Sequence, residues 1–84
     1  MNLNSEKVVV PAPIGRILMN SLISKYQSEI ETAKATLTIY VNNSVGIGEH
    51  PQHLEEMDKL LDQIAASEDK LQAISNHFEI ENNN

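Results

Sequence analysis

Apolar residues recur at intervals of three or four positions along two long stretches of the chain, the spacing of an amphipathic helix. The first stripe comprises Met19, Leu22, Tyr26, Ile30, Ala33, Leu37 and Tyr40. The second comprises Met57, Leu60, Ile64, Ser67, Leu71, Ile74 and Phe78, with Ser67 as its single polar member. A proline suits the first turn of a helix, where its missing N–H costs nothing. We therefore expect helices over 13–43 and 51–79, joined by a loop over 44–50.

One segment of the first stretch has a competing pattern. Thr36–Val41 is rich in β-branched residues, and its apolar and polar side chains alternate as in a strand. A strand there would need a neighbour, and Val8–Val10 is the candidate. Propensity is a weak guide that tertiary packing often overrides, so helix is the prediction and strand the alternative.

The two ends of the chain differ from the stretches between them. Val8–Val10 is β-branched and precedes two prolines, which predicts an extended N-terminal arm over 1–12. This arm could pack on its own helices or reach a second chain. Residues 81–84 have nothing to bury and are expected to form a disordered tail, which leaves 13–80 as the helical unit.

These elements predict an all-α fold, an antiparallel two-helix hairpin with an extended N-terminal arm. A core in a chain of 84 residues rarely supplies more than about 3–5 kcal/mol, so small domains need a further source of stability. Because the chain has no cysteine, we expect two hairpins to complete a four-helix bundle as a homodimer. The predicted self-association interface consists of Leu22, Tyr26, Ile30, Leu37, Met57, Leu60, Ile64, Leu71, Ile74 and Phe78.

Charge narrows the choice of partners. The net charge is −6, and residues 49–84 carry nine acidic side chains against Lys59 and Lys70. Such a surface repels phosphate backbones, so direct nucleic-acid binding is not expected. No apolar stretch approaches the about 20 residues of a membrane span, and no secretory signal is recognisable. The sequence therefore predicts a cytoplasmic protein that does not bind membranes.

Two short motifs could carry chemistry. His50, His53 and Glu56 lie close in sequence and could bind a metal such as zinc, but the two histidines lack the i,i+4 spacing of a zinc helix. Gly46-Ile47-Gly48 lacks the remaining residues of a phosphate-binding loop. We interpret both motifs as parts of a polar loop and of the helix start that follows it, not as binding sites. With no nucleophile beside a base, we expect neither an enzyme nor a bound cofactor.

The segment Val45-Gly46-Ile47-Gly48-Glu49-His50-Pro51, with Met57-Asp58-Lys59 and Ala66-Ser67-Glu68-Asp69-Lys70-Leu71, resembles small uncharacterised proteins of tailed marine bacteriophages. The resemblance covers roughly residues 30–75. It implies a phage-infected host cytoplasm and an accessory or regulatory role, and it assigns no residue a function. Together with the stripes, it favours a non-enzymatic protein-binding role, possible partners being a second copy and an unidentified protein. The alternatives are an acidic mimic of nucleic acid that inhibits a basic protein site, and a metal-binding module using His50, His53 and Glu56.

Overall fold

A computed structural model describes residues 6–42 and 52–81 of the chain. Strand β1 (Val8–Val10) precedes helix α1 (Ile14–Asn42), and helix α2 (Gln52–His77) runs directly into strand β2 (Phe78–Ile80). The prediction of a mostly helical chain is confirmed, since the two helices contain 29 and 26 residues. The loop predicted over 44–50 lies outside the described residues.

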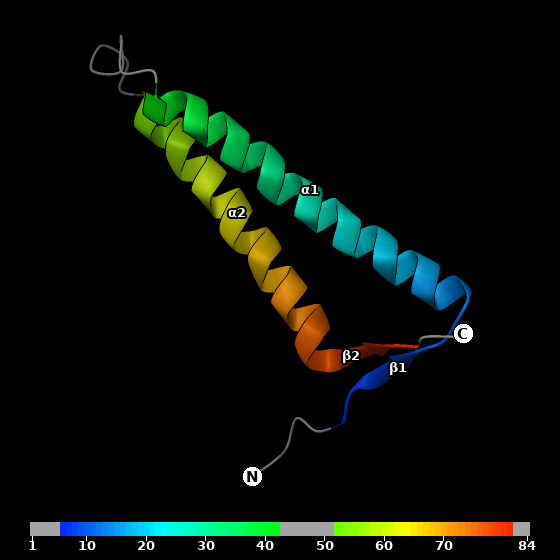
Figure 1. Cartoon of the computed structure of the whole chain (residues 1–84). Coiled ribbons are helices and arrows are strands. Elements are labelled where there is room, and N and C mark those ends of the chain that lie inside the picture. The colour runs from blue at the N-terminus through cyan, green and yellow to red at the C-terminus, as the bar shows by residue number, and fades with distance from the viewer. Residues whose placement is uncertain (1–5, 43–51, 82–84) are drawn as a thin grey trace.

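The two helices lie side by side, as Figure 1 shows. The ring of Tyr40 near the end of α1 meets the ring of His53 near the start of α2, with 5.4 Å between their centroids. Further along, Ser67 reaches Glu29. Contacts thus descend along α1 as they ascend along α2. The helices lie closest where α1 ends and α2 begins, and they diverge toward the strand pair (Figure 1).

Helix α1 continues through Thr36–Val41, so the helix prediction for this segment is confirmed. The hydroxyl of Thr36 donates to the carbonyl oxygen of Thr32 at 3.0 Å, and that of Thr38 to the carbonyl oxygen of Lys34 at 2.7 Å. Each hydroxyl therefore bonds within the preceding turn, which is how threonine is accommodated in a helix interior.

The helix predicted over 51–79 ends two residues early, at His77. Phe78–Ile80 instead forms a parallel ladder with Val8–Val10, in which Val8 pairs with Phe78 and Val10 with Ile80. The all-α prediction holds for the bulk of the chain but missed this strand pair. The extended arm predicted over 1–12 is thus a strand at Val8–Val10, and its partner lies in the same chain.

Glu81 differs from the prediction of a disordered tail over 81–84, because it is held by two hydrogen bonds. Its backbone N–H donates to the carbonyl oxygen of Val10 at 3.0 Å, and its carboxylate accepts the Ala12 N–H at 3.3 Å. Residues 82–84 lie outside the described residues. The strand pair and Glu81 together join the beginning of α1 to the end of α2, and we call this group the clasp.

The molecule is a thin plate, with principal extents of 54 × 32 × 15 Å. A helix with its side chains is about 10–12 Å across, so the plate holds a single layer of helices. Within the described residues, three side chains are buried, those of Val10, Ala33 and Ser67. Domains normally enclose a core between two layers, and this chain supplies one of them. In the described residues, neither helix has the length and hydropathy needed to cross a bilayer.

Candidate interaction face

The residues predicted for self-association are mostly half-buried in the single chain. Nine of the ten, from Tyr26 to Phe78, have intermediate exposure, whereas Leu22 is 41% exposed. The contact between the two helices therefore covers part of each apolar stripe and leaves the remainder accessible.

The uncovered remainder lies on one side of the plate. Ala33 is 3% exposed and marks where α1 meets α2. Each residue turns a helix by about 100°, which places Ile30 and Ile23 on one side of Ala33 and Glu29 on the other. In α2, the same rotation about buried Ser67 places Ile64 on one side of the contact and Gln63 on the other.

Tyr40 contacts His53 while Glu29, earlier in α1, contacts Ser67, later in α2, and with contacts in this order the apolar sides of α1 and α2 open onto the same surface of the plate. We call this surface the apolar face. Its members are Met19, Ile23, Ile30, Leu37 and Val41 of α1 and Met57, Leu61, Ile64 and Leu71 of α2.

A hollow of about 430 Å³ confirms that the two helices contribute to one surface here. Ile23 of α1 lines it together with Leu71 and Ile74 of α2, and Phe78 and Ile80 of the clasp line it as well. The hollow lies at the end where the helices diverge (Figure 1). It is therefore an indentation in the apolar face that the chain does not fill.

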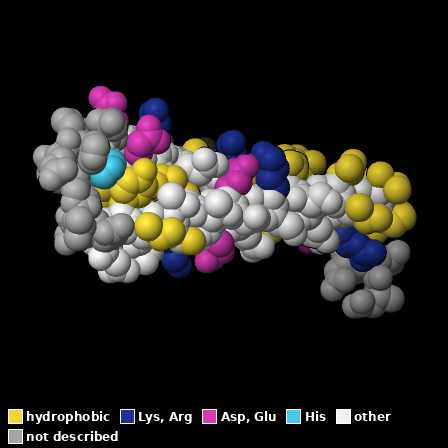
Figure 2. All heavy atoms as spheres, turned by 90° about the horizontal axis from the view of Figure 1, so that it is seen from above, with side chains coloured by type: hydrophobic (Ala, Val, Ile, Leu, Met, Phe, Trp, Pro, Cys, Tyr) yellow, Lys and Arg dark blue, Asp and Glu magenta, His cyan; other side chains and the backbone are white. Residues whose placement is uncertain are grey.

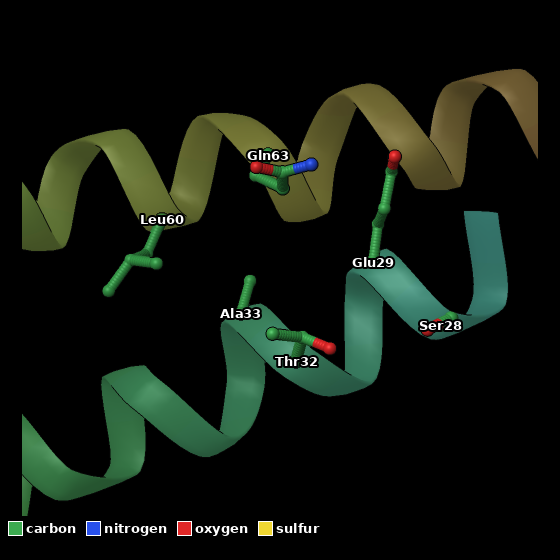
Figure 3. A pocket seen from close by; sticks show the side chains of 6 residues that line it. All are labelled: Ser28, Glu29, Thr32, Ala33, Leu60 and Gln63. Carbon is green, nitrogen blue, oxygen red and sulfur yellow. The ribbon is translucent and has the colours of Figure 1, made fainter. Parts of the chain in front are cut away.

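The opposite surface of the plate is polar along the middle of the helices, whereas toward the two ends of α1 it carries the exposed apolar side chains of Leu18 and Ile39. A smaller hollow of about 180 Å³ is lined there by Ser28, Glu29 and Thr32 of α1 and by Gln63 of α2. Figure 3 shows Glu29 reaching from α1 toward α2, while Ala33 extends into the space between the helices. We call this surface the polar face.

Glu29 is the centre of the polar contacts between the helices. Its carboxylate lies 3.1 Å from the Lys25 ammonium, and it accepts a hydrogen bond of 3.1 Å from the hydroxyl of Ser67. The Lys25 ammonium, followed by the Ser67 hydroxyl, lowers the pKa of Glu29 below its ordinary value. Ser67 is 1% exposed, so this hydrogen bond satisfies a buried polar group.

A second polar contact joins the helices one turn away from Ser67. The Lys70 ammonium lies 5.1 Å from the centroid of the Tyr26 ring, and Lys25 lies 5.4 Å from the same ring. These are cation–π distances. The sequence pattern identified Ser67 as a polar interruption but missed its partner. A glutamate placed beside the apolar stripe of the other helix was the available signal.

Further apolar side chains are exposed at both ends of the plate. Where α1 begins, Ile14, Ile17 and Leu18 are 54–64% exposed, and Figure 2 shows hydrophobic side chains gathered at that end. Near the other end, Val41 is 62% and Leu54 69% exposed. Helical rotation places Val41 on the apolar face but Ile14 and Leu18 on the other side of α1, so exposed apolar side chains are not confined to the apolar face.

The candidate metal ligands are not brought together in the described residues. His53 packs edge-on against Tyr40, and the Glu56 carboxylate lies 3.4 Å from the Lys59 ammonium. His50 and Gly46–Gly48 lie outside the described residues. Over 6–42 and 52–81, no three histidine or acidic side chains are placed to share a metal ion.

Comparison with protein families, with functionally characterised proteins and with solved structures gives no match to this chain. The resemblance to small bacteriophage proteins therefore stays a prediction. The apolar face is the feature from which a function can be argued.

Proposed function

We propose that this chain is a non-enzymatic protein-binding module that acts as an acidic helical oligomer. Its two helices form an antiparallel hairpin, and the apolar faces of two hairpins pack together as a four-helix bundle. The observation that carries the proposal is an apolar face left open on a plate 15 Å thick. A second hairpin supplies the layer that a core requires.

The exposed area supports a partner of this size. The whole chain exposes 6387 Å², whereas a compact monomer of 9.4 kDa is expected to expose about 5,000 Å². The excess of about 1,400 Å² per copy, or about 2,800 Å² for two copies, is of the size that obligate homodimers bury. An interface of this size supports the proposed self-association.

Light scattering during size-exclusion chromatography tests this proposal at tens of micromolar protein. We expect twice the mass of the 9.4 kDa chain. Leu61 lies on the apolar face and is 52% exposed, so Leu61→Glu should leave the hairpin folded. Losing the burial of this side chain should weaken the dimer by at least about tenfold.

Ala73→Glu is the matched control for Leu61→Glu. Ala73 is exposed on α2, and the helical rotation places it beside the polar face at the mirror position of Leu61. The control should keep the wild-type mass. A wild-type monomer, or equal effects of the two variants, would contradict the proposal.

The acidic surface of α2 supports a second candidate, a mimic of nucleic acid that occupies a basic protein site. Glu55, Asp58, Asp62, Glu68 and Asp69 are all exposed on this helix. Added salt would weaken binding through these charges, because it screens exposed groups. Binding through the apolar face would change little over the same range of salt.

A further inference from the structure

We infer that the second copy docks with its α2 along α1 of the first copy, so that α1 and α2 alternate around the four-helix bundle. This inference rests on the proposed self-association and specifies its arrangement. Two identical plates can pair their apolar faces about a two-fold axis in two ways. An axis parallel to the helices places α1 of one copy against α2 of the other. An axis across the helices places α1 against α1 of the other copy, and α2 against α2.

The net charges of the helices distinguish the two arrangements. Helix α1 carries three basic and two acidic side chains, and α2 carries six acidic and two basic ones. The helices therefore have formal net charges of +1 and −4 with histidine neutral. Placing α2 against α2 of the second copy brings two acidic helices together, whereas alternation separates them by the basic α1. Electrostatic complementarity of this kind sets partner orientation more than affinity.

The charges beside the apolar face show the same asymmetry. Lys34 directly follows Ala33, and about 100° of rotation places it at the outer edge of the apolar face on α1. Arg16 occupies the equivalent edge nearer the clasp. On α2, Glu68 directly follows Ser67 and lies at the outer edge of the same face. Alternation places the basic edge of one copy against the acidic edge of the other.

Disulfide cross-linking separates the arrangements, because the natural chain has no cysteine. Gln27 and Gln72 are exposed and uncharged, and they lie at the outer edges of the apolar face on α1 and α2. Within one chain they point away from each other on opposite edges. Across the alternating interface, Gln27 of one copy lies beside Gln72 of the other. The double variant Gln27→Cys/Gln72→Cys should therefore oxidise to a covalent dimer.

The single variants and a mirror pair provide the controls. Under alternation, neither Gln27→Cys nor Gln72→Cys alone should form covalent dimer above background. The background is set by Ser28→Cys/Ala73→Cys, which places the same two cysteines at mirror positions beside the polar face. The yields are read on a non-reducing gel at the concentration used for light scattering.

The possible results distinguish this inference from the proposed function. Covalent dimer from Gln27→Cys alone indicates α1 against α1 and overturns the alternating arrangement, while self-association stands. A dimer by light scattering whose double variant gives only the background yield also overturns it. A wild-type monomer by light scattering rejects both proposals.

Discussion

Replacing Ser67 by leucine tests whether the two helices are held together by close packing or by hydrophobic pattern alone. Ser67 occupies the one polar position of the apolar stripe of α2. By pattern alone, leucine would complete the stripe and stabilise the protein. The structure predicts the reverse, because Ser67 is 1% exposed where α2 meets α1, so a leucine there would have to displace its neighbours.

The expected loss follows from the packing at this position. Forcing extra methylene groups into a filled site costs about 1–3 kcal/mol. The variant also removes the hydroxyl that bonds to Glu29 at 3.1 Å, which adds to the loss. A chain of this size has about 3–5 kcal/mol of stability from its core. Ser67→Leu should therefore remove a third or more of the free energy of unfolding.

Urea denaturation followed by circular dichroism at 222 nm measures this loss. Protein concentration must be equal for all variants, because dimer stability depends on it. With a slope of about 1 kcal/mol per molar urea, the midpoint should fall by about 1–3 M. Ser67→Ala is the control, since it removes the same hydrogen bond without adding volume. Its midpoint should lie between those of the wild type and Ser67→Leu. A Ser67→Leu midpoint at or above that of the wild type would refute the packing argument.

Three further predictions concern single contacts. Because Lys25 lowers the pKa of Glu29 in the folded chain, the stability from this pair is present above the ordinary pKa of 4.5 and is lost as pH falls through the lowered value. Between pH 7 and pH 3, the free energy of unfolding should fall less in Glu29→Gln than in the wild type. Gly15→Ala would place a Cβ 2.9 Å from Val10 Cγ1, so it should speed amide exchange in β1 even though alanine favours the helix by up to about 1 kcal/mol. Adding Val10→Ala removes the clash and should return the exchange rate toward that of the wild type. Glu81→Ala removes an exposed hydrogen bond of the clasp and should cost about 0.5–1 kcal/mol in thermal unfolding; an unchanged midpoint would show that its carboxylate does not hold the clasp.

The helices were predictable because their signal is local. Leu, Ile and Met recur at helical spacing over both stretches, and this periodicity persists through Thr36–Val41 despite its β-branched residues. The threonine hydroxyls bond to carbonyl oxygens one turn earlier, so the helix loses no backbone partner there. Periodicity correctly outweighed residue propensity in this segment.

The clasp was not predictable because its two strands are nearly the whole chain apart. Phe78 continues the apolar spacing of α2, so every local rule extends the helix through it. Pairing with Val8–Val10 decides the outcome instead, and a pattern read along neighbouring residues does not report a pairing between the two ends of the chain. Glu81 follows for the same reason, since its partners are Val10 and Ala12.

The periodic stripes could not show how each is divided between the partner helix and a second copy. A stripe gives the width of an apolar surface and not the direction from which it is covered. In the structure, the intramolecular contact passes through Ala33 and Ser67, while Ile30 and Ile64 lie to the same side of it. The small residues let the helices approach, and the large ones lie beside the contact with only partial cover. This displacement makes one face of the plate apolar, and it is the physical reason to expect a second layer.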